Sequence, residues 1–290
     1  YIDLPIQREK HTGFPKVGAS SLKGAIREVF EEDRDIDYPS ETNKTKAKAG
    51  VDLAFGSDKG DSHAGAIGFT DARLLLFPVK SLKGIFAWVT CPRVLKKFKQ
   101  ELELCHETDN KKELEELADA IPDPANVENK ISDLAQLGIS GKVVLEEYSF
   151  TLTVLPDLKT FASKLNGYLV LDDLDKRLIV LKDDEFTDMV KLHTEVISRI
   201  KIGENGTADG GALFNEEFLP AESVMYSLVL ASPIFKEKED DKGIFKKTNG
   251  KQEYENLMEY FKQGMKGVFQ LGGDATLGKG IIKTNKKLLV

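Results

Sequence analysis

Residues 3–27 have the sequence DLPIQREKHTGFPKVGASSLKGAIR. An Asp-x-Pro turn, a basic Gln-Arg pair and a Thr-Gly-Phe-Pro turn follow one another and lead directly into a helical pattern. Over residues 20–32 the apolar side chains recur at the three- and four-residue spacing of an amphipathic helix. Ser20 or Ser21 is the expected N-cap, because a serine hydroxyl accepts hydrogen bonds from the first free backbone amides.

The remaining patterned segments alternate between strand and helix. We predict a buried strand over 66–79, a helix through 81–102, helical structure in the charged segment 106–135, strands over 142–155 and 222–231, a final helix around 254–268 and a terminal strand from Ile281. Strands adjoin strands and long segments separate the elements. This order favours the α+β class over a doubly wound parallel sheet.

Segments without a sustained hydrophobic period lie between these elements. Residues 31–65 are polar and predict a mobile insertion, and residues 94–140 predict a mainly helical one. The glycine-rich stretch 199–220 is too long for a tight turn, and residues 237–251 have the composition of a solvated loop. The length allows one large domain or two ordinary ones.

Composition excludes several classes of protein. The chain has 290 residues, of which 41% are hydrophobic and 31% charged, as is typical of globular proteins and not of disordered ones. The longest apolar runs are shorter than the roughly 18 residues of a membrane span. Two cysteines and the lack of a signal-peptide pattern indicate a reducing, cytoplasmic compartment. The chain begins at Tyr1 instead of Met, so we expect a further N-terminal strand before it.

Charge is distributed unevenly along the chain. The net charge is −7, which argues against indiscriminate coating of nucleic acid. Residues 1–30 nevertheless carry five basic and three acidic side chains, and residues 262–290 carry six lysines and one aspartate. The middle of the chain is therefore strongly acidic and both ends are basic. If the ends meet in space they form one positive surface; otherwise these lysines are merely solvated.

Two segments are candidates for binding phosphate. Residues 273–279, GDATLGK, match the G-x-x-x-x-G-K spacing of a nucleotide-binding loop, but Gly280 stands where that loop needs Ser or Thr. A helix–loop–strand order is also expected here, where such a loop needs strand–loop–helix. A nucleotide cofactor is therefore not expected, although the glycines and Lys279 can still cradle a phosphate. The alternative is a simple connector.

The helix start at Ser20 is the second candidate. Lys23 lies in the first turn, where the helix dipole disfavours a cation unless an anion is shared, and Arg27 follows four residues later on the same face. Two hydroxyls, free N–H groups and two cations are suited to a phosphate. A capped helix with a solvated basic face is the alternative.

Other chemistries find little support. The cysteines and histidines show no C-x-x-C or H-x-x-x-H spacing, so a structural zinc ion is not expected, and Cys91 is expected to be packed in or beside a helix. The chain has neither a G-x-S-x-G motif of serine hydrolases nor the RNP1 pattern of RNA-recognition motifs.

Taken together, several motifs resemble the RAMP superfamily of CRISPR effector proteins, and in detail the repeated backbone subunit of the type III-B (Cmr) complex. They are IDLPIQRE, TGFP and SSLKGA-x-R near the start, FGSD at 55–58, AGAI-x-FTDAR at 64–73, SLKG-x-FAWVTCPR at 81–93 and LGGDATLGKG near the end. They cover most of the chain. One departure is VGASS, where relatives often have Gly directly before the serines.

The resemblance implies a single RAMP domain over residues 1–290 with a ferredoxin-like (RRM-like) palm, finger-like insertions and a thumb hairpin at 193–220. Copies of such a subunit stack along a CRISPR guide RNA beside other Cmr subunits and face a target RNA. Guide phosphates would contact Ser20, Ser21, Lys23 and Arg27. The further RNA-binding residues implied are Arg199, Phe214, Gly272, Gly273, Gly278, Lys279 and Gly280.

The resemblance also implies endoribonuclease activity within the assembled complex. The aspartate of the I-D-x-P segment, here Asp3, would cleave the target with a divalent ion, Mg²⁺ or Mn²⁺, and His11, Glu216 and Glu217 are weaker candidates. From the residues alone, Asp3 is a turn-capping aspartate and His11 a surface histidine. The alternative function is a non-catalytic RNA-binding protomer, which has no need of a carboxylate at Asp3.

Overall fold

A computed structural model describes residues 2–37, 49–57, 64–105, 111–203, 205–247 and 250–285. The chain forms two compact units. Unit 1 combines Tyr1–Lys16 with Arg73–Tyr226, and unit 2 combines Val17–Ala72 with Ser227–Val290. Of the mobile insertion expected at 31–65, residues 38–48 and 58–63 lie outside the described residues. Residues 31–37 continue a long helix, and residues 49–55 form a short helix with several buried side chains. No helix within the described ranges is both long and apolar enough to cross a bilayer.

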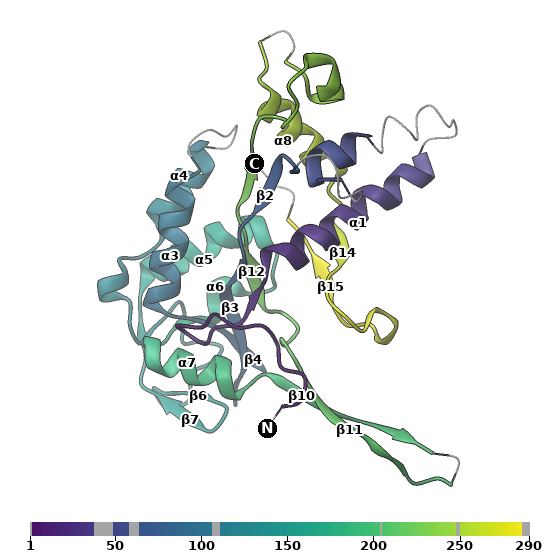
Figure 1. Cartoon of the computed structure of the whole chain (residues 1–290). Coiled ribbons are helices and arrows are strands. Elements are labelled where there is room, and N and C mark those ends of the chain that lie inside the picture. The colour runs from purple at the N-terminus through teal and green to yellow at the C-terminus, as the bar shows by residue number, and fades with distance from the viewer. Residues whose placement is uncertain are drawn as a thin grey trace. The chain divides into compact units, whose positions relative to one another are not determined.

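A mixed sheet forms the centre of unit 1 (Figure 1). Its strand order is β3 (Ala72–Lys80), β4 (Phe86–Thr90), β9 (Leu178–Val180), β5 (Lys130–Ile131) and β8 (Thr153–Val154). β3 and β4 are antiparallel, whereas β4 and β9 are parallel. β12 (Val224–Tyr226) pairs with β3, and β1 (Lys16–Val17), where the chain leaves unit 1, is also next to β3. The central strands β4 and β9 are almost entirely buried.

Helices cover this sheet. They are α3 (Pro92–Glu103), α4 (Lys111–Ala120), α5 (Pro156–Leu169), α6 (Leu174–Arg177) and α7 (Asp183–Leu192), with a short 3₁₀ turn η1 (Pro124–Asn126). α5 packs against β5 and β9, and α4 packs against both α3 and α5. α4 was predicted, whereas α5, α6, β9 and α7 lie in a stretch to which the sequence analysis assigns no element. The only helical structure in residues 121–140 is the 3₁₀ turn η1, so the α-helical content expected for 94–140 ends at Ala120.

The helix predicted through 81–102 is wrong in its first half. Residues 86–90 form the buried strand β4, and the helix begins only at Pro92, a residue favoured at the first helical position. The preceding turn requires Gly84, whose φ is +81° and whose added Cβ would lie 2.8 Å from the Leu137 side chain. FAWVT is rich in aromatic and β-branched residues, and strand neighbours on both sides decide its conformation.

Three predicted strands are divided by turns. Residues 66–79 form β2 (Ile67–Phe69) and β3, which belong to different sheets. Residues 142–155 form the hairpin β6 (Val143–Leu145) and β7 (Tyr148–Phe150), followed by β8. Residues 222–231 form β12 and β13 (Val229–Ala231). In each case the apolar run continues through a turn, so the composition does not reveal the break.

Unit 2 is built around α1 (Ala19–Asp37), which confirms the helix predicted at 20–32. α1 packs against β2, α8 (Glu253–Gly264) and β14 (Val268–Gln270). A short helix at 49–55, the β2–β13 pair and the β14–β15 hairpin complete the unit, with β15 at Ile281–Lys283. The aromatic core includes Phe30, stacked on Phe261 at 5.9 Å. The expected loop at 237–251 contains a 3₁₀ segment, η2 (Glu239–Phe245), whose Phe245 is buried.

One long hairpin extends from unit 1. β10 (Glu195–Ile202) and β11 (Ala208–Phe218) pair antiparallel from Glu195 opposite Phe218 to Ile202 opposite Ala208. Figure 1 shows this hairpin projecting beyond the sheet of its unit. It lies within the stretch 193–220 singled out in the sequence.

Candidate functional site

The N-terminal segment lies along the base of the β10–β11 hairpin. The Leu4 amide donates to the Asn215 carbonyl and the Glu217 amide donates to the Leu4 carbonyl, each at 3.0 Å, in a parallel bridge. Asp3 accepts a hydrogen bond from the Asn215 amide on its Oδ2 at 2.8 Å. Asp3 is exposed, so this contact fixes the carboxylate at the surface of the hairpin base.

The buried side chain of Glu217 holds the N-terminal segment against the base of the hairpin. Its side chain is only 2% exposed, and its carboxylate accepts hydrogen bonds from Arg8 at 2.5 Å, from the Thr194 hydroxyl at 2.6 Å and from the Ile6 amide at 3.0 Å. Burial alone would raise the pKa of Glu217, but these hydrogen bonds and the Arg8 charge outweigh it and hold the pKa below its usual value. Glu217 therefore positions the N-terminal segment and is not open to a substrate.

Glu216 and Arg199 form an ion pair on the hairpin. Arg199 Nε lies 2.7 Å from Glu216 Oε2, and its guanidinium lies over the Phe218 ring at 5.7 Å. Phe214 is the direct cross-strand neighbour of Arg199. A phosphate approaching Arg199 must therefore compete with Glu216.

His11 belongs to a separate turn. Its side chain is 73% exposed and lies 3.8 Å from Glu9, whose carboxylate also accepts from Thr12 and pairs with Arg73. Within the described residues, no hydrogen bond or ion pair joins His11 to Asp3. The structure thus gathers Asp3, Glu216 and Glu217 at the hairpin base and leaves His11 outside the group.

The start of α1 differs from the expected serine cap. The Ala19 amide donates to Asp71 Oδ1 at 2.8 Å, so an acidic side chain distant in sequence accepts a hydrogen bond from the first residue of the helix. Ser20 and Ser21 lie in the first turn and are exposed. The expectation that one of them caps the helix is wrong, because a tertiary neighbour supplies the acceptor.

The two cations of this helix have different surroundings. Lys23 Nζ donates to the Ile67 carbonyl at 2.8 Å, and burial, with a smaller contribution from the Arg27 charge, lowers the pKa of Lys23. Arg27 pairs with Glu31 at 3.0 Å and with Asp52 at 3.3 Å. The charge of Arg27 is therefore already balanced by carboxylates, whereas Lys23 contacts only a carbonyl among the described residues.

The glycine loop connects two strands. It runs from β14 to β15 and contains a 3₁₀ turn, η3 (Ala275–Leu277), so the order is strand–loop–strand and not the helix–loop–strand expected. The Leu271 amide donates to the Gly280 carbonyl at 2.8 Å and closes the loop. Gly272, Gly273 and Gly278 are exposed, while Lys279 and Gly280 are half-buried at its closure.

Gly280 is indispensable to this closure. Its φ is +72°, and an added Cβ would lie 2.1 Å from the Leu271 carbonyl oxygen. We expect Gly280→Ala to destabilise the protein by about 1–3 kcal/mol, since strain and a main-chain clash coincide. Gly273→Ala is the matched control, because nothing lies within 4 Å of its Cβ position. Thermal unfolding of both variants measures their difference in stability. Equal melting temperatures would contradict the role of Gly280 in closing the loop.

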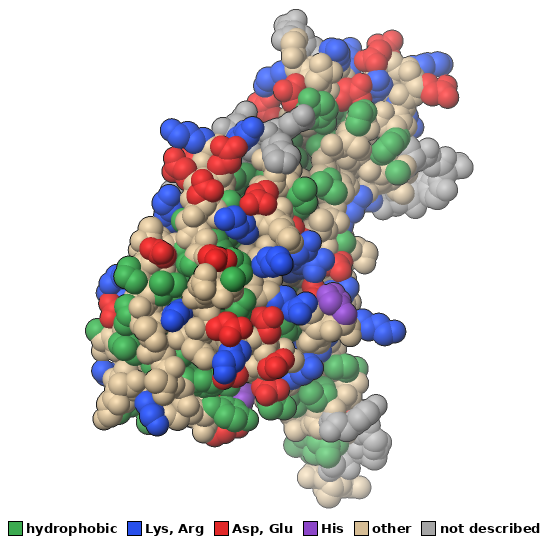
Figure 2. Space-filling model, turned by 90° about the vertical axis from the view of Figure 1, so that its left-hand side faces the viewer, with side chains coloured by type: hydrophobic (Ala, Val, Ile, Leu, Met, Phe, Trp, Pro, Cys, Tyr) green, Lys and Arg blue, Asp and Glu red, His purple; other side chains and the backbone are tan. Residues whose placement is uncertain are grey.

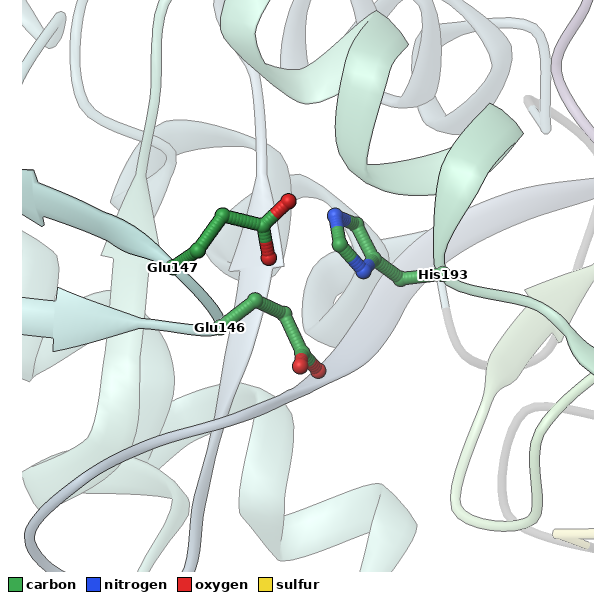
Figure 3. A group of neighbouring side chains, drawn as sticks. All are labelled: Glu146, Glu147 and His193. Carbon is green, nitrogen blue, oxygen red and sulfur yellow. The ribbon is translucent and has the colours of Figure 1, made fainter.

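Metal-ligating side chains cluster elsewhere in unit 1. Glu146, Glu147 and His193 form the only group of three such residues found in the described part of the chain (Figure 3). Asp3 is not part of any such group there. No sequence motif indicates this cluster, because its members come from the β6–β7 turn and the end of α7.

Comparison with known proteins identifies the family. The model of the RAMP superfamily matches residues 1–283. The chain is 33% identical to the Cmr endoribonuclease Cmr4 of the CRISPR system of Pyrococcus furiosus, over 99% of this chain and 88% of that protein. It is 26% identical to the CMR subunit Cmr4 of Saccharolobus solfataricus, over 97% of this chain and 88% of that protein.

Solved structures of similar proteins match the fold of this chain. Oligomeric Cmr4 from Pyrococcus furiosus matches with a TM-score of 0.65 and 28% identity, over 97% of this chain and 90% of that one. A chain of the type III-B Cmr-beta complex bound to cognate target RNA has the same fold, with a TM-score of 0.72 and 23% identity over 100% of this chain and 90% of that one. The mixed α+β fold class is thereby confirmed.

Proposed function

Because the chain belongs to the RAMP superfamily, we propose that it is a backbone subunit of a type III-B Cmr effector complex, stacks with copies of itself along a CRISPR guide RNA, and cleaves complementary target RNA. The observation that carries this proposal is the likeness to the Cmr endoribonuclease over nearly the whole chain. The exposed carboxylate of Asp3, held at the base of a projecting hairpin, supports it. Such a complex works in the cytoplasm, which fits the low cysteine content.

The parts of the chain take the roles that the family implies. The mixed sheet of unit 1 belongs to the ferredoxin-like palm, residues 31–65 and 94–140 are the finger-like insertions, and the β10–β11 hairpin is the thumb. Exposed apolar side chains on the hairpin, Ile200, Ile202 and Leu213, support the last assignment. Hydrophobic atoms are visible on the hairpin at the bottom of Figure 2. Such side chains can enter a nucleic-acid stack and displace a base pair.

This displacement provides the geometry for cleavage. A 2′-hydroxyl attacks the adjacent phosphate only from an in-line position, which a continuous A-form helix does not allow. A hairpin that unstacks one nucleotide creates this alignment. Asp3, beside the displaced nucleotide, accepts or orients the hydroxyl proton while the 2′-oxygen bonds to phosphorus and the bond from phosphorus to the 5′-oxygen breaks. The leaving 5′-oxygen takes a proton from water, so the products are a 2′,3′-cyclic phosphate and a 5′-hydroxyl.

A divalent ion can be held at Asp3 only when phosphate oxygens of the RNA supply further ligands. Mg²⁺ in nucleic-acid enzymes is commonly held by one or two carboxylates and by substrate phosphates. Asp3 supplies one such carboxylate. When bound there, Mg²⁺ or Mn²⁺ would stabilise charge on the phosphate.

Guide binding is proposed at the α1 start, with Ser20, Ser21 and Lys23, and along the glycine loop. Arg27 contributes less, since Glu31 and Asp52 already neutralise it. On the face shown in Figure 2, basic and acidic side chains are interspersed. In this proposal, phosphate contacts at the start of α1 and along the glycine loop carry the RNA, and the face in Figure 2 presents no broad positive field.

Lys23→Ala tests the guide site. One lost phosphate contact should reduce the slope of log affinity against log salt by about 0.7 for single-stranded RNA. Lys142→Ala removes the same charge at an exposed position of unit 1 and should leave the slope unchanged. The measurement is RNA affinity of the purified protein from low to high salt. Equal slopes for Lys23→Ala and the parent would contradict the site.

The function itself is tested by reconstitution. The full chain is assembled with the other Cmr subunits and a guide RNA, and a labelled complementary RNA is added with Mg²⁺. Cuts at regular intervals within the paired region support the proposal. Assembly on the guide without cutting would identify a non-catalytic RNA-binding protomer, and failure to bind guide RNA would overturn both functions.

A further inference from the structure

Glu146, Glu147 and His193 converge from two parts of unit 1. The two glutamates form the two-residue turn between β6 and β7, and His193 follows the last residue of α7. One ligand atom of each residue lies within 4.8 Å of the others. In Figure 3 the imidazole points toward the Glu147 carboxylate, and the Glu146 carboxylate lies on the same side of the turn.

The imidazole has an unsatisfied nitrogen at this point. His193 Nε2 is buried and has no hydrogen-bond partner among the described residues. Buried polar atoms are nearly always paired, so such a nitrogen calls for a ligand. The Tyr148 ring lies edge-on to the imidazole at 6.3 Å and restricts its orientation.

The two carboxylates also lack a cation. Glu146 accepts a hydrogen bond from the Lys80 amide at 3.2 Å, but no Lys or Arg forms an ion pair with Glu146 or Glu147 in the described structure. Two adjacent negative charges facing an unpaired imidazole nitrogen are an arrangement that a bound cation stabilises.

We propose that Glu146, Glu147 and His193 bind a divalent transition-metal ion of the Mn²⁺ or Zn²⁺ type. Carboxylate oxygens suit Mn²⁺ and imidazole suits Zn²⁺, whereas Mg²⁺ requires oxygen ligands in near-ideal octahedral geometry. Metal–ligand bonds of about 2.0–2.2 Å place ligands roughly 3–4 Å apart, so small side-chain rotations close the observed spacing.

The bound ion would join the β6–β7 turn to the base of the β10–β11 hairpin. His193 precedes Thr194, whose hydroxyl donates to Glu217, and Glu217 holds the N-terminal segment through Arg8. The metal thus stabilises the hairpin base through residues other than Asp3. This site is separate from the proposed cleavage chemistry and does not depend on it.

Electron paramagnetic resonance of Mn²⁺ tests the site on the full chain without RNA or partner subunits. After chelator treatment and buffer exchange, one Mn²⁺ per chain should bind, with loss of the free-ion signal. Added Zn²⁺ should displace it and equimolar Mg²⁺ should not. His193→Ala and Glu147→Gln should each weaken binding by at least about tenfold, since even outer-sphere changes cost 10–100-fold.

Two control variants separate this site from nonspecific binding. His11→Ala removes an exposed imidazole and Glu103→Gln an exposed carboxylate, and both should bind Mn²⁺ as the parent does. Glu147 is exposed, so its variant should fold normally. Absence of Mn²⁺ binding, or binding equal in the parent, His193→Ala and Glu147→Gln, would overturn the proposal. Because no RNA is present, neither result bears on the ribonuclease function.

Discussion

Asp3→Asn is expected to reduce cleavage of target RNA by about 10²–10⁴-fold in the assembled complex, the contribution of a positioned acid–base group. Asparagine has almost the same size and can still accept the Asn215 amide hydrogen bond that holds Asp3 at 2.8 Å. The N-terminal segment should therefore keep its place on the hairpin. Guide and target binding should persist, because they depend on phosphate contacts elsewhere.

Asp172→Asn provides the matched control, since it makes the same chemical change at another exposed position of unit 1. It should cleave like the parent. Cleavage rates are compared under single-turnover conditions with divalent metal, beside a binding assay on the same samples. Full cutting by Asp3→Asn would show that Asp3 only stabilises its turn, and the non-catalytic protomer would become the better description of this subunit.

Arg8→Met is expected to destabilise the protein by about 3 kcal/mol at neutral pH. This is the lower end of the range for breaking a buried ion pair, because Glu217 keeps its hydrogen bonds from Thr194 and Ile6. The Arg8 hydrogen bonds to the Gly13 and Val190 carbonyls, both at 2.9 Å, are lost as well. Adding Glu217→Gln to Arg8→Met should recover part of the stability, since it removes the unpaired charge.

The pH dependence of stability distinguishes the effect of the unpaired Glu217 charge in Arg8→Met from the effect of lost packing. The pKa of Glu217 lies below its ordinary value of 4.5 in the folded protein, so its contribution to stability is complete above about pH 4.5 and decreases as the pH falls through the folded pKa. In Arg8→Met the unpaired carboxyl becomes neutral on acidification and its penalty disappears. The stability difference between parent and variant should therefore shrink from pH 7 to pH 3. A constant difference would assign the whole effect to packing.

Local sequence patterns predicted correctly the elements whose apolar residues are regularly spaced within one segment. The helix expected at 20–32 is α1, the one expected around 254–268 is α8, and the terminal strand begins at Ile281 as predicted. In each case the spacing of apolar residues reports one face of one element, and that information is contained in the segment itself.

The patterns were wrong where neighbours in space decide the conformation. FAWVT became β4 because strands β3 and β9 flank it, and neither pairing is visible in a run of apolar residues. The expected serine cap of α1 was replaced by Asp71, a residue 52 positions away. Short apolar runs fit a buried strand and a buried helix equally well, so tertiary contacts choose between them.

The sequence by itself determined the α+β class, the family and the residue types of the candidate site, including Asp3, Glu216 and Lys23. Only the tertiary structure decided which of them lie close together. Arg8 and Glu217 are 209 residues apart and form one buried pair, while Arg27 and Glu216 have their charges matched by partners that no motif includes. The reason is physical: periodicity depends on neighbours within a few residues, whereas hydrogen bonds, burial and ion pairing depend on distance in space.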